Sequence, residues 1–163
     1  MKLQENGHYD GFDALEDSEW ILGVAFIAAQ TYIIGTWADI NGILTESNSA
    51  IKRVSKENLL LLDVNWIANG VTRIQLVNAI ANYQKHHDEW EGWQIDGKNQ
   101  ATIDILKNCG ISKDTEFPCY TAATLLWPDS RIGELSYLLG LLEDWRERVF
   151  RKYKPQGKGQ SVQ

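Results

Sequence analysis

The sequence predicts an all-α fold, a helical bundle of four or five main helices. No proline stands between Asp17 and Pro118, and a proline inside a helix costs about 3 kcal/mol. Apolar residues recur at spacings of three and four, whereas runs that alternate polar and apolar residues are scarce. Helices that bury such faces against one another form bundles. We therefore expect no β-strand.

The first expected helix runs from Asp17 to Leu44 and is the central one. Asp17 or Ser18 can cap its start, and Gly42 marks its expected end. Its apolar residues fill nearly the whole circumference, as in a helix that other helices surround. Two glycines mark expected close contacts with neighbouring helices, Gly23 and Gly35.

A second helical segment is expected to begin at Ser55, and its run of four leucines enters the core. Asn69 and Gly70 form a turn signal, which predicts a break or a kink in the helix at this point. Thr72 is a good N-cap for the next helix, which is expected over residues 73–90.

The C-terminal half is expected to hold two short segments and one long helix. A helix begins after Asn99 and ends before Gly110. Residues 120–127 form either a short helix or an extended piece, and the last helix follows Pro128. That helix ends in cations that suit the negative end of a helix dipole, namely Arg146, Arg148, Arg151, Lys152 and Lys154.

The length of 163 residues fits one domain, which we expect over residues 1–153, with a disordered tail over residues 154–163. The net charge is −6. An acidic surface repels phosphate backbones, so RNA is a disfavoured partner. The start of the chain is polar, and the apolar run Ile21–Ile34 is too short to span a bilayer. We therefore expect a cytoplasmic protein with no membrane contact.

The stretch NYQKHHDEWEGW, residues 82–93, holds the candidate site, because it contains two of the three histidines. On the helix expected here, Tyr83 and His87 fall on an apolar stripe. Asn82 and His86 fall on a different, polar line. The two adjacent histidines therefore point in different directions.

A metal site is one interpretation of this stretch. His86 and Glu89 are three residues apart, which can place two ligands on one face of a helix. A complete site needs three or four ligands. Cys109 and Cys119 match no zinc spacing and are expected to be free thiols. We therefore expect no metal and no cofactor.

A structural interpretation assigns the stretch to packing at a helix end and to partner binding. Tyr83 and His87 pack together, while Trp90 and Trp93 anchor the end of the helix. Lys85 places a cation at the negative end of the dipole. The expected binding residues are therefore Tyr83, Lys85, His87, Trp90 and Trp93.

The segments AAQTYIIG and ANYQKH resemble the HEPN group of small all-α bacterial proteins. Those proteins carry an Arg, a polar residue that is often Asn, and a His on one helix, and many are toxins or antiphage ribonucleases that act as dimers. Asn82 and His86 match the polar residue and the His, whereas Ala81 stands at the Arg position. The resemblance implies a metal-independent ribonuclease in which His86 acts as acid/base or contacts phosphate, and Asn82 orients it. The letters ANY-x-KH-x-x-EW are also similar to uncharacterised bacterial proteins, and this similarity implies no activity.

The expected function is that of a non-catalytic bacterial interaction or accessory protein, and the divergent ribonuclease is the alternative. The HEPN-like resemblance implies an association with a defence or toxin–antitoxin system. A protein partner is expected, together with a homodimer. A ribonuclease needs His86 exposed in a cleft, whereas an interaction protein would hold it in a packed row with Asn82 and Asn78 or on a plain surface. The aromatic anchors expected to face the partner are Trp37, Trp66, Trp90 and Trp93.

Overall fold

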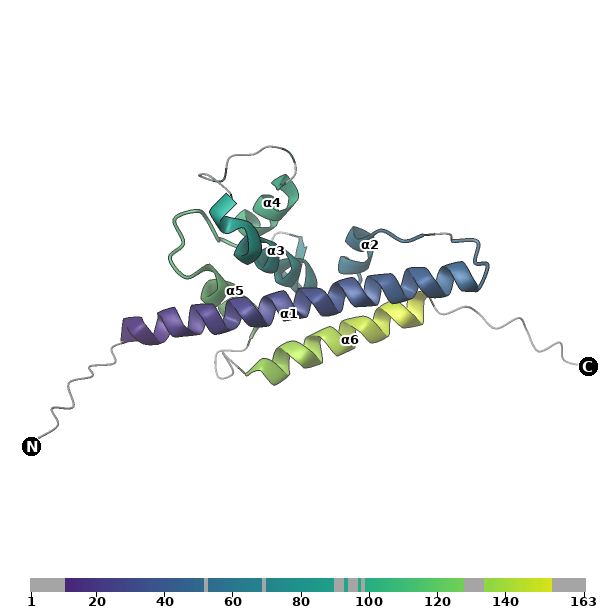
Figure 1. Cartoon of the computed structure of the whole chain (residues 1–163), viewed down its shortest axis with the longest axis horizontal. Helices are drawn as coiled ribbons and strands as arrows, with labels where there is room; N and C mark the ends of the chain where they lie inside the picture. Colours follow the sequence, from purple (N-terminus) through teal and green to yellow (C-terminus); the bar gives the residue numbers. More distant parts are fainter. Residues whose placement is uncertain are drawn as a thin grey trace, which may run out of the picture.

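The computed structural model describes residues 11–51, 53–68, 70–89, 93, 97, 99–127 and 134–153. Its elements are α1 (Gly11–Glu46), α2 (Lys56–Leu60), β1 (Trp66–Ala68), β2 (Val71–Thr72), α3 (Arg73–His86), the 3-10 turn η1 (His87–Glu89), α4 (Gln100–Asn108), α5 (Pro118–Leu126) and α6 (Leu135–Tyr153). The prediction of an all-α fold is confirmed. The longest helix, α1, crosses the whole molecule, with α3, α4 and α5 on one side of it and α6 on another (Figure 1).

α1 is longer at both ends than the sequence predicted. It begins at Gly11, and the Ser18 hydroxyl, an expected cap, instead donates to a carbonyl one turn earlier at 2.7 Å. Gly42 does not end the helix. Asn48 takes that role with a φ of 49°, and its amide donates to the Thr45 carbonyl at 3.3 Å, as expected of a left-handed residue that closes a helix.

The segment between α1 and α3 holds a short helix and a hairpin. Ser55 caps α2 as predicted, since its hydroxyl accepts from the Asn58 amide at 3.2 Å. The predicted break is confirmed, but the prediction that the chain has no strand is wrong, because Trp66 of β1 pairs with Thr72 of β2. Gly70 takes a φ of 79° in the turn, which glycine adopts readily. An Asn-Gly pair between two short apolar runs is a hairpin signal.

A partly buried ion pair fixes the segment just before this hairpin to the start of α3. Arg73 donates from Nε and Nη2 to the two carboxylate oxygens of Asp63 at 3.1 and 3.0 Å, and the Arg73 amide donates to the same group. Thr72 and Gln75 form a capping box beside it, so the prediction of Thr72 as N-cap is confirmed. The start of α3 is therefore held by both its cap and its salt bridge.

The C-terminal helices follow the predicted order. Gly110, with a φ of 76°, follows the end of α4 as predicted. Asn99 occupies the cap position of α4, but its side chain forms no capping hydrogen bond. Residues 120–127 belong almost entirely to α5, a helix that has Pro118 in its first turn, where a missing N–H is tolerated. The predicted tail, residues 154–163, lies outside the described residues.

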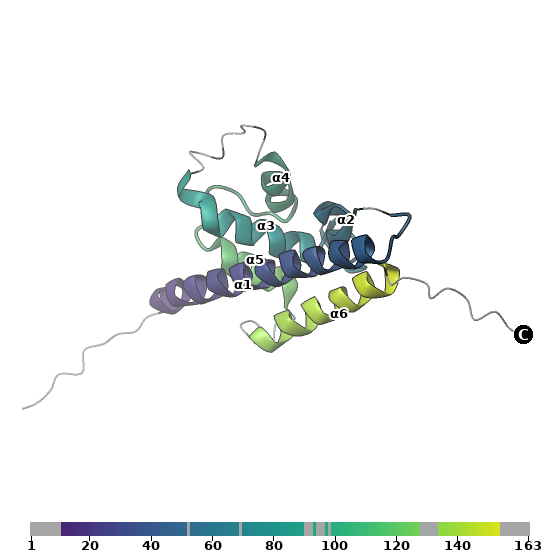
Figure 2. The ribbon, with the colours of Figure 1, turned by 45° about the vertical axis from the view of Figure 1, so that its right-hand side comes forward.

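The core lies where α1 meets α3, α5 and α6 (Figure 2). α3 is buried on nearly every side, and its fully buried apolar residues are Ile74, Leu76, Val77, Ala79, Ile80 and Ala81. The close contact expected at Gly23 is confirmed, because a Cβ there would lie 2.9 Å from the Gln84 side chain. The one expected at Gly35 is wrong, because nothing lies within 4 Å of such an atom.

One side of α1 is not covered by the other residues that the structure describes. Trp20, Ile21 and Val24 are all exposed there, so the prediction of a helix surrounded on all sides is wrong for this side. The sequence predicted an apolar run too short to span a bilayer. In the structure, α1 is long and apolar enough to cross a membrane, judged by length and composition alone, so that prediction is wrong. Its other side packs against α3, α5 and α6 and buries the polar side chain of Gln30, as in the core helix of a globular bundle.

Candidate functional site

The inner side of α3 holds a hydrogen-bond network that joins three helices. Gln30 of α1 donates from Nε2 to the side-chain oxygens of Asn78 and Asn82 at 3.1 and 2.6 Å. Asn82 donates in turn to the Thr102 hydroxyl of α4 at 3.4 Å, and Lys85 donates to the Gln30 oxygen. We call these five residues the Gln30 network. Because buried polar groups are costly when unpaired, the network fixes how α1, α3 and α4 meet.

The two residues of the HEPN-like motif lie in different environments. Both ends of the Asn82 side chain are engaged inside the Gln30 network. The His86 side chain is 48% exposed, and its Nδ1 lies 3.4 Å from a carboxylate oxygen of Glu89 at the helix end. Lys85, rather than His86, continues the row that begins at Asn78 and Asn82.

The aromatic residues of the predicted site gather beside α5. The ring of Tyr83 lies with its centroid 5.7 Å from that of His87 and 5.8 Å from that of Trp93. Trp93 is only 9% exposed. It therefore serves the core and is not available as an anchor for a partner. Trp90 lies outside the described residues.

A cleft of about 330 Å³ opens beside this cluster, and Tyr83 and His87 line it together with acidic side chains. One of those acids, Glu19 of α1, already has a structural role. Its carboxylate accepts from the amides of Cys119 and Tyr120 at 2.7 and 2.8 Å, and so caps the start of α5. Burial, reinforced by Cys119 and Glu19, raises the pKa of Tyr83. The cleft therefore contains the neutral phenol of Tyr83 and the carboxylate of Glu19, which already caps α5.

Both cysteines are free, buried thiols, as predicted. Burial raises the pKa of Cys109 to about 11. Burial and the neighbouring Glu19 carboxylate raise the pKa of Cys119 even further. A thiol is a poor nucleophile when its pKa is raised in this way. Within the described residues, no group of three His, Cys, Asp or Glu side chains comes together as metal ligands would.

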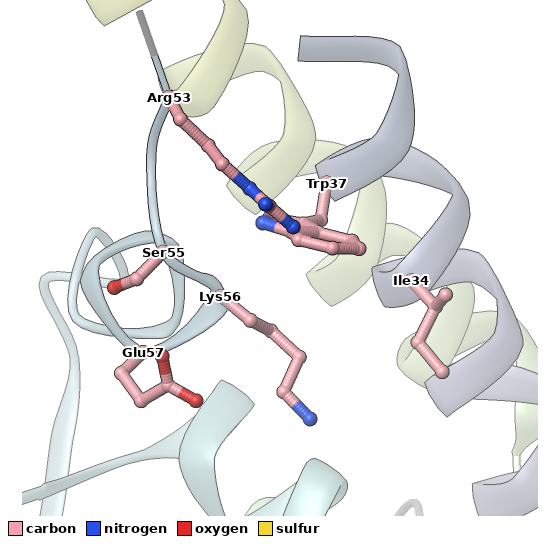
Figure 3. Close-up of a pocket in the computed structure, with 6 residues that line it drawn as sticks. All are labelled: Ile34, Trp37, Arg53, Ser55, Lys56 and Glu57. Atoms are coloured by element: carbon pink, nitrogen blue, oxygen red, sulfur yellow. The ribbon is translucent and has the colours of Figure 1, made fainter. Parts of the chain in front are cut away.

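A larger cleft, of about 640 Å³, lies between α1 and the chain that leads into α2. We call it the Trp37 cleft, and it is lined by Ile34, Trp37, Arg53, Ser55, Lys56 and Glu57 (Figure 3). The Arg53 guanidinium lies over the indole of Trp37, 5.5 Å from the ring centroid. Lys56 extends its amine into the space between α2 and α1 (Figure 3). Of the expected anchors, Trp37 thus lies at a surface cleft, and Trp66 is exposed on the hairpin.

Hydrogen bonds to Val54 hold the two walls of the Trp37 cleft together. The Trp37 indole N–H donates to the Val54 carbonyl at 2.8 Å. Asn41 donates to the same carbonyl at 3.2 Å and accepts from the Val54 amide at 2.9 Å. The Val54 side chain is buried in the core. Arg53, which precedes Val54, therefore projects from a fixed backbone.

The Trp37 cleft is basic, although the protein as a whole is acidic. Neither Arg53 nor Lys56 forms an ion pair with any residue in the described ranges. Glu57 is the one carboxylate among the six lining residues, so the cations outnumber it. Ile34 adds exposed apolar surface beside the cations. This combination suits an anionic group that is attached to an apolar body.

Comparisons with protein-family models, with curated proteins and with solved structures gave no match. The HEPN-like resemblance therefore stays a prediction, and so does any activity that it implies.

Sequence reasoning missed Arg53 and Lys56 as site residues. The signal was present, because KRVSK, residues 52–56, is a basic run in an acidic chain. The sequence did not reveal that Arg53 lies over Trp37, since that contact depends on the turn after α1. No local sequence pattern predicts a contact between residues so far apart in the chain.

Proposed function

We propose that this protein is a non-catalytic interaction protein that associates through the exposed apolar side of α1 and the adjacent side of α6. The observation that carries this proposal is the set of exposed apolar side chains there. They are Trp20, Ile21, Val24, Leu135 and Leu139, which are 70%, 60%, 66%, 46% and 50% exposed. We call these five residues the α1–α6 face. Apolar residues gathered on a surface mark sites of protein–protein or membrane interaction, and the groove and the charges beside these residues lead us to propose a protein partner.

A groove of about 250 Å³ between the two helices continues this apolar surface. It is lined by Ala25, Ala28, Ala29, Tyr32, Leu135, Leu138, Leu139 and Leu142. The alanines allow the backbone of another helix to come close, and the leucines supply apolar area. Each large side chain of the face that becomes fully buried would contribute about 1.5–3 kcal/mol. The face is therefore suited to being covered by another helix.

A second copy of this chain is the partner that the charges favour. α1 and α6 run in the same direction (Figures 1 and 2). Glu16 is exposed in the first turns of α1, whereas Arg148 and Arg151 lie near the end of α6. All three lie about 15–20 Å along the helix axis from the level of Ala28, the acid in one direction and the arginines in the other. An antiparallel two-fold pairing centred there brings acidic and basic ends together, and a parallel pairing brings the acids together.

The ribonuclease alternative has less support. Asn82 is committed to the Gln30 network, so it is not placed to orient His86. His86 pairs with Glu89 at the surface, and Ala81 stands where the family carries its arginine. A place in a defence or toxin–antitoxin system stays a prediction that rests on the HEPN-like resemblance alone.

Sedimentation velocity over a range of concentrations tests the proposal. Val24→Glu and Leu139→Glu each place a charge in the α1–α6 face, and Leu61→Glu is the matched control, because Leu61 is equally an exposed apolar residue but lies at the end of α2. We expect a dimeric wild type, a dimeric control, and monomeric face variants with unchanged helical circular dichroism. A wild type that is monomeric at every concentration, or face variants that remain dimeric, would contradict the proposal.

A further inference from the structure

Arg53 of the Trp37 cleft is held in place, and neither Arg53 nor Lys56 pairs with an acid among the described residues. Arg53 stacks on Trp37, and the residue that follows it is clamped to α1 by three hydrogen bonds. Lys56 is partly buried at the start of α2, whose N-cap is Ser55. A group that is already fixed loses little conformational entropy on binding. The planar guanidinium of an arginine also matches the two oxygens of a carboxylate.

The remaining lining residues narrow the chemistry of the ligand. Ile34 is exposed beside the cations, so an apolar group next to the anion would gain by covering it. Glu57 also lines the cleft, and its charge opposes a ligand that carries several negative charges. A single carboxylate with an apolar neighbour satisfies both conditions.

The shape of the cleft indicates where such a carboxylate comes from. Two short segments form its walls, one turn of α1 and residues 53–57 (Figure 3). The cleft is open to solvent. A site for a free small molecule encloses most of its ligand, whereas a side chain that projects from a protein is covered by the rest of that protein. The net charge of −6 opposes a nucleic-acid backbone. We infer that the Trp37 cleft binds an Asp or Glu side chain of a protein partner, next to an apolar side chain of the same partner.

This inference rests on the proposed interaction function and adds a second surface to it. The Trp37 cleft and the α1–α6 face share no residue. Loss of one surface therefore leaves the other intact, and each can be tested alone.

Chemical-shift titration tests the inference, with the indole N–H of Trp37 and the Nε–H of Arg53 as reporters. The probes are N-acetyl-Leu-Glu-amide, its neutral counterpart N-acetyl-Leu-Gln-amide, sodium acetate and inorganic phosphate. We expect the Leu-Glu peptide to shift both signals and to bind about tenfold more tightly than each of the other three probes. Val24→Glu, which disrupts only the α1–α6 face, should bind the Leu-Glu peptide like the wild type.

Two sets of variants assign the binding to the cleft. Lys56→Gln alone and Arg53→Gln with Lys56→Gln should weaken the Leu-Glu peptide progressively. The matched control is Lys107→Gln with Lys113→Gln, which removes two exposed cations elsewhere and should leave binding unchanged. Because Arg53→Gln also removes the stacking on Trp37, the single Lys56 variant tests the site with that contact intact. The inference is overturned if the Trp37 signal does not move, if the Leu-Gln peptide binds as well, or if phosphate alone binds as tightly as the Leu-Glu peptide.

Discussion

α1 and α3 both carry apolar residues at helical spacing, but the described part of the chain covers α3 on nearly every side and α1 on one side. Along α3, residues such as Ile74 and Ile80 are fully buried among α1, α4 and α5. Along α1, Phe26 and Ile33 are fully buried, while Val24 remains exposed on the opposite side. The difference shows that the apolar residues of a helix predict that its surface is stabilised by burial, but they do not predict which molecule buries it. We propose that a second molecule buries the exposed side of α1.

The charged residues show the same contrast between two surfaces. In the stretch at the end of α3, His86 lies 3.4 Å from Glu89, and His87 lies 3.1 Å from Asp88. In the Trp37 cleft, Arg53 and Lys56 have no such partner among the described residues. The two histidines of the stretch that looked most functional in the sequence therefore have carboxylate neighbours, whereas the cations of the Trp37 cleft are the ones that we propose bind a partner.

The largest expected effect is a difference in stability between a truncation in α3 and a truncation in α1. Ile80→Ala should lower the free energy of unfolding by about 2–5 kcal/mol, because it leaves a cavity at a fully buried position. Ile21→Ala removes the same atoms from the exposed side of α1 and should change the stability of the monomer by less than about 0.5 kcal/mol. Urea unfolding at low protein concentration measures both. Similar losses in the two variants would show that α1 is buried on both sides.

A smaller effect is expected in the Gln30 network. Gln30→Ala removes the hydrogen bond donated to the side-chain oxygen of the buried Asn78, and should cost about 1–3 kcal/mol. The neighbouring Thr31→Ala is the control, since the exposed Thr31 hydroxyl only donates within α1, and should be nearly neutral. Thermal unfolding compares them. The account of the network fails if the two variants lose equal stability.

The cysteines test how well the core excludes solvent. Because burial raises the pKa of Cys109 from 9.0 to about 11, its thiolate fraction at pH 8 is about 100-fold below that of the unfolded chain. Between these two pKa values the native state binds more protons than the unfolded state, so its stability should fall as the pH rises from about 9 to 11. Thiol labelling at pH 8, with and without denaturant, measures the first effect. Fast labelling of the native protein would contradict the burial of both thiols.

No effect is expected at the histidine that resembles a catalytic residue. Wild type and His86→Ala should both leave RNA uncleaved in EDTA, because Asn82 is engaged elsewhere and His86 lies on the surface. Incubation with a broad set of RNAs, with oligomeric state measured in parallel, checks this. Cleavage by the wild type that His86→Ala abolishes would restore the ribonuclease reading.

The features that the sequence predicted well are those with local causes. Ser55 and Thr72 cap helices because their hydroxyls reach amides three residues ahead, and Gly110 follows a helix because it tolerates a positive φ. The predicted end of α1 was wrong. Gly42 lies inside the helix, and Asn48 is the left-handed residue that follows its end.

The parts of the candidate site that were missed depend on distant contacts. Trp93 was expected to face a partner, but it packs against Tyr83 in the core. The basic run that contains Arg53 could be seen in the sequence, but the stacking of Arg53 on Trp37 of α1 could not. Both contacts form between residues that are far apart in the sequence. The spacing of apolar residues within one helix does not predict such contacts.

Cysteine cross-linking at the centre of the α1–α6 face tests the central claim most directly. Ala28→Cys places a thiol near the proposed two-fold axis, while Thr45→Cys places one far along the same helix as a control; Cys109 and Cys119 are buried and should not react. Under mild oxidation, we predict a disulfide-linked dimer from Ala28→Cys and none from Thr45→Cys. No dimer from Ala28→Cys, or equal cross-linking at both positions, would contradict an antiparallel association of two copies through this face.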